Sequence, residues 1–161
     1  MTTPLINSIL AKAPQQGRVE RITVRPGKGK RPREIDAWPI GEPGYDYGRS
    51  KRRAVTLIQA EHLPLIAQLM GQDSPPDLLD LRRNILVSGF NLRALLDGWR
   101  FQLGDAILRG TVEADPCEQM EAALGPGAIH AMVGHGGICA AIEQPGLVRV
   151  GDPLIRLDRV K

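Results

Sequence analysis

Residues 99–112 read WRFQLGDAILRGTV, in which two strand-like runs flank Gly104-Asp105. Runs rich in aromatic and β-branched residues on either side of a turn signal indicate antiparallel strands. Residues 147–150 and 154–157 flank Gly151-Asp152 in the same way. Both places therefore predict antiparallel turns of a meander. Because Gly-Asp departs from the favoured Asn-Gly or Asp-Gly hairpin order, we expect longer or wider turns here.

The rest of the chain contains further short elements. Strand-like runs occur at residues 19–24, 54–58, 85–87 and 138–142, helical patterns at 60–70 and 116–124, and a long irregular segment at 26–48. Several short strands, few helices and regularly spaced turn signals favour a mainly β (α+β) fold. We expect a small, partly closed β-barrel with a few short peripheral helices.

Length and composition indicate one ordinary globular domain. The 161 residues are 42% hydrophobic, which suffices for a real core. Residues 1–16 are predicted to be a loose N-terminal tail and residues 17–161 a single domain. Since no segment approaches the roughly 20 apolar residues needed to cross a bilayer and no leader pattern is present, we predict a cytoplasmic protein without membrane contact. Two cysteines are too few for a disulfide scaffold and lack zinc-ribbon spacing.

Positive charge gathers in two places although the net charge is only +3. The first cluster is Arg25, Lys28, Lys30, Arg31 and Arg33, and the second is Arg49, Lys51, Arg52 and Arg53. Clusters of this kind either hold phosphate or another anion, or are solvated loops.

Cys117 is the strongest candidate for chemistry. It lies in Asp115-Pro116-Cys117-Glu118, which reads as a helix start with Asp115 at the N-cap and Pro116 at the first helical position. Unpartnered backbone N–H groups at a helix start favour the thiolate, the form that attacks sulfur, oxidises or binds a metal. The alternative is a small buried hydrophobe, because free cysteine is often buried.

Two other segments contain candidate binding residues. Gly134-His135-Gly136-Gly137 either lets the backbone approach a ligand, with His135 as a donor to an anion, or is a tight loop before a strand. Arg82-Arg83-Asn84 precedes a buried strand, so a guanidinium there could face the barrel interior or its mouth and grip a phosphate. The alternative is a surface pair ending a helix. Asn91 follows the same strand, whereas His62 and His130 are isolated.

The chain lacks the sequence signatures of several types of reaction. The chain contains no serine-histidine-acid order, phosphate-cradling glycine loop or dinucleotide fingerprint, and no spaced histidine-carboxylate cluster. Any chemistry is therefore expected to depend on Cys117.

Taken together, the motifs resemble the MOSC domain family, named after the C-terminal part of molybdenum-cofactor sulfurases. The matching segments are 55–64, 81–85, 88–92, 101–106, 115–117, 120–121, 124–125, 134–138 and 151–152. They occur in order over about residues 17–157, as in a small stand-alone bacterial member.

The resemblance implies a barrel-like domain whose characteristic cysteine matches Cys117. In sulfurases of this kind that cysteine is thought to receive sulfur, as a persulfide, from a pyridoxal-phosphate-dependent cysteine desulfurase and pass it to the molybdenum cofactor. In related reductases of N-hydroxylated compounds, the matching cysteine binds molybdenum. The residues expected to hold the cofactor or shape its site are Arg83, Asn84, Asn91, Gly134, His135 and Gly136.

One segment departs from the family pattern. Many members carry Gly-Asp and then a His-His-Gly-Gly-like segment before the first Val-Thr-Leu strand, whereas residues 44–52 here read GYDYGRSKR. No histidine can be carried over, and Arg52 or Arg53 is the candidate substitute.

Two functions from different classes follow from these residues. The first is a molybdenum-cofactor-binding or sulfur-carrying protein that uses Cys117, with a small-molecule substrate and with sulfur or electrons supplied by a desulfurase or reductase partner. The alternative is a non-catalytic anion or nucleic-acid binding module that uses the basic loops. The few aromatics near those loops disfavour nucleic acid.

Overall fold

The computed structural model describes residues 4–5, 16–48 and 50–160. It contains β1 (Gln16–Val24), β2 (Arg33–Ile35), β3 (Ala37–Ile40), η1 (Lys51–Arg53), β4 (Val55–Gln59), α2 (His62–Leu69), α3 (Leu78–Leu81), β5 (Ile85–Ser88), η2 (Leu92–Leu95), β6 (Trp99–Leu103), β7 (Ala106–Glu113), α4 (Glu118–Leu124), α5 (Ala128–Met132), β8 (Ile138–Gln144), β9 (Gly146–Arg149) and β10 (Pro153–Arg159). The predicted tail lies almost wholly outside the described residues.

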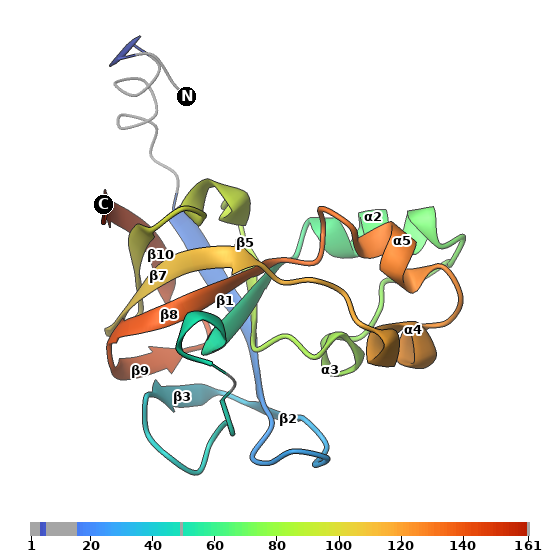
Figure 1. The fold of residues 1–161 in the computed structure, drawn as a ribbon, viewed down its shortest axis with the longest axis horizontal. Helices are drawn as coiled ribbons and strands as arrows, with labels where there is room; N and C mark the ends of the chain where they lie inside the picture. The colour runs from blue at the N-terminus through green and yellow to red at the C-terminus, as the bar shows by residue number, and fades with distance from the viewer. Residues whose placement is uncertain (1–3, 6–15, 49, 161) are drawn as a thin grey trace.

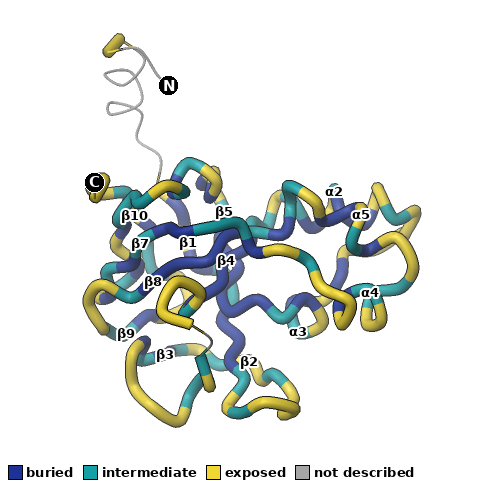
Figure 2. Tube along the Cα trace, viewed as in Figure 1, coloured by how far each residue is buried: buried dark blue, intermediate teal, exposed yellow. Residues whose placement is uncertain are grey.

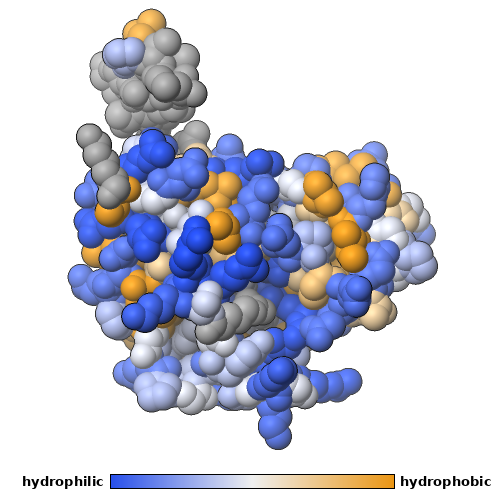
Figure 3. All heavy atoms as spheres, viewed as in Figure 1, coloured by the Kyte–Doolittle hydropathy of each residue, from blue (hydrophilic) through white to orange (hydrophobic). Residues whose placement is uncertain are grey.

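The strands close into a barrel, which confirms the predicted fold class. The order is β10-β6-β7-β8-β4-β5-β1, and pairing of β1 with β10 completes a ring of seven strands within the described part of the chain. Strand β2 extends the sheet from β1, while β3 and β9 form a separate two-stranded sheet. Helices α2 to α5 gather on one side of the barrel (Figure 1). Hydrophilic residues cover most of the face seen in this view (Figure 3).

One strand pair explains why the helices lie there. Strands β4 and β5 are parallel, unlike the antiparallel pairs around the rest of the ring. A parallel pair needs a crossover connection, and residues 60–84 supply it with α2 and α3. This crossover covers the outer face of both strands.

The core consequently has two compartments, seen as buried segments on both sides of β4 in Figure 2. Leu57 points into the barrel core, whereas its neighbour Ile58 packs under the helices. Ile85 and Leu86 divide in the same way on β5. Successive side chains of a strand face opposite sides, so a strand covered on both faces reads as a continuous apolar run.

Two local predictions were wrong. The Gly104-Asp105 turn is tight, because Leu103 pairs directly with Ala106, and Gly104 adopts a positive φ of 56° that suits a glycine-first hairpin turn. Strands β9 and β10 do not form a hairpin. Instead β9 pairs with β3, and β10 pairs with β6 and β1.

The segment 26–48 is also more regular than predicted, because it contains β2 and β3. The two strands have only three and four residues, which is too short for a local pattern to mark them as strands. The partner of β3 is β9, more than 100 residues away in the sequence. No helix within the described residues is both long and apolar enough to span a membrane.

Gly137 provides a test of the packing between β4 and the segment before β8. Its φ is +92°, and a Cβ there would lie 1.9 Å from the Leu57 carbonyl oxygen. Gly29 has a similar φ of +78° but open space around it. We expect Gly29→Ala to cost about 1–2 kcal/mol from its left-handed backbone alone, and Gly137→Ala to cost at least about 3 kcal/mol or prevent folding. Urea denaturation of both variants measures the difference, and equal losses would contradict the predicted clash.

Candidate functional site

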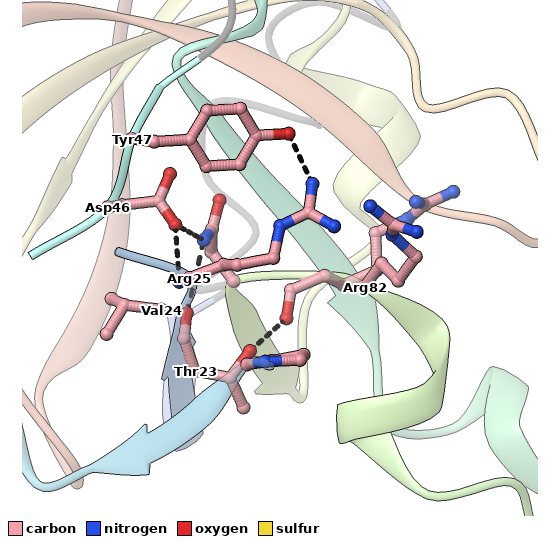
Figure 4. A pocket seen from close by; sticks show the side chains of 9 residues that line it. Thr23, Val24, Arg25, Asp46, Tyr47 and Arg82 are labelled. Carbon is pink, nitrogen blue, oxygen red and sulfur yellow. Dashed lines mark hydrogen bonds between the residues drawn. The ribbon is translucent and has the colours of Figure 1, made fainter. Parts of the chain in front are cut away.

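A pocket of about 230 Å³ lies where the barrel meets the helices. Its lining residues come from the end of β1, the loop and η1 before β4, strands β4 and β8, the α3–β5 junction, the link from β7 to α4, and α4 itself. They are Arg25, Tyr47, Arg53, Thr56, Arg82, Arg83, Ala114, Asp115, Cys117, Gln119, Met120 and Cys139. A smaller adjoining pocket shares Arg25, Tyr47, Arg82 and Arg83 (Figure 4). The fold thus brings together Cys117, the Arg82–Asn84 segment and parts of both basic clusters.

Cys117 is exposed and lines this pocket, but the helix starts later than predicted. Cys117 itself is the N-cap of α4, with an extended backbone, and its carbonyl accepts from Met120 N and Glu121 N. The chain stays extended up to it because Ala114 N donates to Gly137 O and Arg83 donates to the carbonyls of Ala114 and Asp115. Asp115 is therefore not the cap.

Cys139 lies on the wall of the same pocket. It is on β8 and is 3% exposed. Neither cysteine forms a disulfide in the structure. Their difference in exposure means that a reagent in solution meets Cys117 first.

Arg83 is the buried cation of the site. It is 3% exposed, and its guanidinium donates to Gly136 O at 2.7 Å and to Ala114 O at 2.9 Å. Contacts of 3.5 Å to Leu81 O and Asp115 O are also present. Arg83 therefore joins the α3–β5 junction to the β7–α4 link and to the segment before β8, and it also lines the pocket.

Asn84 ties the same junction to two strands. Its side-chain oxygen accepts from Thr56 N at 3.0 Å and Thr56 Oγ1 at 3.1 Å, and its amide donates to Thr23 O at 3.1 Å. A further bond of 3.3 Å runs to Asp46 Oδ1. Because these bonds lie within the protein, the geometry gives Asn84 a positioning role, and direct cofactor binding by Arg83 and Asn84 stays a prediction.

The remaining pocket arginines are not neutralised by acids. Among the described residues, no carboxylate lies within 4 Å of the guanidinium groups of Arg25, Arg53 or Arg82, whereas Arg21, Arg93, Arg100 and Arg109 elsewhere each form an ion pair. Arg25 instead donates to the Tyr47 hydroxyl and lies 4.7 Å from the centre of its ring. Arg82 donates to Gln119. The pocket consequently carries a local excess of positive charge beside the thiol.

The unusual loop before β4 contributes two residues that the sequence did not identify. Asp46 accepts from Arg25 N at 2.8 Å and from Gly48 N at 3.3 Å, which holds the loop against β1. This places Tyr47 over Arg25, as Figure 4 shows. Of the two proposed substitutes for the missing histidines, Arg53 lines the pocket, while the Arg52 carbonyl accepts from Thr111 Oγ1.

The glycine-rich segment after α5 serves backbone packing. A Cβ at Gly136 would lie 2.8 Å from the Ala114 carbonyl oxygen, and one at Gly137 still closer to Leu57. The tight-loop interpretation therefore accounts for both glycines, since they allow strands to approach each other. Gly134, with φ +79°, lies beside Arg93.

His135 lies outside the pocket lining and contacts His62 on α2, with ring centres 5.2 Å apart in an edge-to-face arrangement. Burial lowers the pKa of His62, and the neighbouring His135 and Arg93 lower it further, while Glu61 opposes them. Asn91 is the N-cap of η2 and does not line either pocket. Within the described chain, no three His, Cys, Asp or Glu side chains are grouped to hold a metal ion.

The fold and the site together define a β-barrel domain with one exposed thiol in an arginine-lined pocket. The sequence matches the profile of the MOSC domain over residues 44–155, and the chain belongs to the MOSC domain family. No curated protein matches the sequence.

Solved structures agree with this fold. The YuaD protein from Bacillus subtilis has a TM-score of 0.74 at 23% identity, covering 86% of this chain and 94% of that one. YiiM from Geobacillus stearothermophilus gives 0.72 at 16% identity, covering 88% and 75%, and YiiM from Escherichia coli gives 0.69 at 20% identity, covering 89% and 71%. At these sequence identities of 16–23%, the structural similarity shows the barrel fold alone.

The buried fork of Arg83 yields a stability prediction. Arg83→Lys keeps the charge but lacks the planar fork that reaches the carbonyls of both Ala114 and Gly136. We therefore expect the free energy of unfolding to fall by about 2–4 kcal/mol. Arg82→Lys, on the neighbouring half-buried residue, should cost about 1 kcal/mol or less. Urea unfolding measures both, and a tolerated Arg83→Lys would contradict the bridging role.

The lowered pKa of His62 predicts a pH dependence of stability. The unfolded chain binds a proton near the ordinary value of about 6.5, whereas the folded chain binds it only at lower pH. Stability should therefore fall as pH drops below about 6.5 and level off below the folded pKa. Thermal unfolding from pH 7.5 to 5 should show this decline, reduced in His62→Gln, while the exposed His130→Gln behaves like the wild type. A His62→Gln profile identical to wild type would contradict the prediction.

Proposed function

We propose that this protein binds the molybdenum cofactor and uses Cys117 as its sulfur acceptor or as a ligand to molybdenum. The supporting observation is an exposed thiol in a pocket whose guanidinium groups at Arg25, Arg53 and Arg82 have no acidic partner among the described residues. The choice of the molybdenum cofactor comes from membership of the MOSC domain family.

The donor groups in the pocket fit this cofactor chemically. Planar guanidinium groups bind phosphate in two-point fashion, and the cofactor carries a phosphate. A thiolate is a soft ligand suited to metals that prefer sulfur. Since ligand-sized pockets usually measure about 300–1,000 Å³, the observed 230 Å³ would hold one end of the cofactor and leave the rest at the mouth.

The chain's own residues would each have a distinct task. Arg25, Arg53 and Arg82 would neutralise and orient the anionic group, and Cys117 would release its proton to solvent and present the thiolate. Arg83 would keep the β7–α4 link, and hence Cys117, in place. When bound, the cofactor would supply the molybdenum centre for sulfur or oxygen-atom chemistry.

Partners are part of this proposal. A cysteine desulfurase would bring sulfur to Cys117, or a reductase would bring electrons for reduction of an N-hydroxylated small molecule. The exposure of Cys117 supports access by either partner.

The deciding measurement is molybdenum per chain by mass spectrometry, on protein purified from a host that makes the cofactor. Wild type should retain molybdenum, and Cys117→Ser should lose most of it, by about tenfold or more, if the thiolate is a ligand. Arg156→Gln, whose guanidinium lies over Trp99 outside the pocket lining, is the matched control and should retain it.

The same samples test the sulfur-carrier branch. A persulfide on wild-type Cys117 without molybdenum would assign the cysteine to sulfur transfer, whereas molybdenum that depends on Cys117 would direct tests to N-hydroxylated bases with a reductase. Absence of both molybdenum and persulfide from wild type would contradict the proposal.

A further inference from the structure

We infer that the pocket accepts sulfur directly from a small dianionic sulfane-sulfur donor, of which thiosulfate is the simplest. This activity deepens the proposed function, because it rests on Cys117 as a sulfur acceptor and names a donor class that requires no protein partner. It would make the chain a sulfurtransferase in its own right.

Charge is the first step of the argument. Four arginines outside the pocket, Arg21, Arg93, Arg100 and Arg109, each form an ion pair with a carboxylate. Those around the thiol at Arg25, Arg53 and Arg82 have no carboxylate within 4 Å in the described part of the chain. An excess of cations in a recess concentrates small anions and strengthens their binding. A ligand group that complements this recess therefore carries more than one negative charge.

The carboxylate of Asp115, at the pocket edge, does not cancel the excess positive charge of the three arginines. Asp115 contributes to the lining and is exposed to solvent. Asp46, in the adjoining pocket, accepts hydrogen bonds from the backbone amides of Arg25 and Gly48 and from the side-chain amide of Asn84. A bound anion would therefore meet more guanidinium than carboxylate groups.

Size is the second step. A volume of about 230 Å³ is small for a pterin but ample for an anion of a few heavy atoms together with water. The thiol of Cys117 is exposed in this recess, whereas Cys139 is buried in its wall. A donor held by the arginines would thus meet one accessible thiol.

The chemistry balances without a further reactant. After the Cys117 thiol loses its proton to solvent, the thiolate attacks the outer sulfur of thiosulfate. The sulfur–sulfur bond of thiosulfate breaks, and sulfite leaves with the bonding electron pair, so that Cys117 becomes a persulfide. The guanidinium groups would stabilise the negative charge that moves onto sulfite. A nucleophilic acceptor then takes the terminal sulfur and restores the thiolate.

The experiment uses thiosulfate as donor and cyanide as acceptor, with thiocyanate formation as the readout. Wild type should turn over and should gain one sulfur atom by intact mass when cyanide is omitted, whereas Cys117→Ser should do neither. Arg53→Gln should raise the KM for thiosulfate about tenfold, as expected for the loss of one charged hydrogen bond. Arg100→Gln on the outer barrel should leave KM unchanged.

Alkylation separates the role of charge from a structural effect. Iodoacetate is an anion and iodoacetamide is neutral, but both modify an exposed thiol. Arg53→Gln should slow modification of Cys117 by iodoacetate several-fold while leaving the iodoacetamide rate the same, and added salt should reduce the difference. Equal slowing of both reagents would overturn the electrostatic role.

The two functional proposals fail in different ways. If wild-type Cys117 reacts with iodoacetamide but gains no sulfur from thiosulfate, the direct-donor inference is overturned, and the molybdenum measurement still stands by itself. Thiocyanate formation that persists in Cys117→Ser would overturn it equally.

Discussion

The structure depends on the buried side chains of Arg83 and Asn84, adjacent residues at the junction between α3 and β5. The Arg83 guanidinium satisfies carbonyls of Ala114 and Gly136, while the Asn84 amide bonds to backbone groups of Thr23 and Thr56. Buried polar groups cost free energy unless they are paired, so these residues hold their surrounding segments in one arrangement. These bonds join the barrel to the helical side, and the pocket lies along the seam between them.

Unequal pairing of charge connects this architecture to function. Arg100 and Arg109 on the outer barrel have carboxylate partners, whereas at the seam Arg25 donates to a tyrosine and Arg82 to a glutamine. Tyr47 occupies the position opposite Arg25 because Asp46 anchors the loop to β1. The result is an electropositive recess around a thiol. Both the cofactor proposal and the sulfane-donor proposal depend on this recess, but they differ in the group that reaches Cys117.

Local patterns were sufficient for much of the fold. The β6–β7 hairpin, the β4 strand followed by α2, and the β5 strand all appeared in the sequence as short apolar runs with turn signals. The pairing of β9 with β3 did not, because partner choice depends on contacts more than 100 residues apart. The start of α4 was misplaced for a similar reason, since long-range hydrogen bonds to Ala114 and Asp115 keep the chain extended past the expected cap.

The sequence was enough to predict the barrel class and the family and to single out Cys117 as the candidate for chemistry, because strand periodicity, turn residues and ordered motifs are local properties. The exposure of Cys117 was decided by the fold. It also marked both basic clusters as candidate anion sites. The tertiary structure decided which cations share a pocket with the thiol. Arg25 and Arg53 come from segments far from Cys117 in sequence and line the same pocket, whereas Arg52, next to Arg53, does not. The difference is physical, since a side chain's charge is encoded at one position but its neighbours and its burial are set by strand pairing and chain closure.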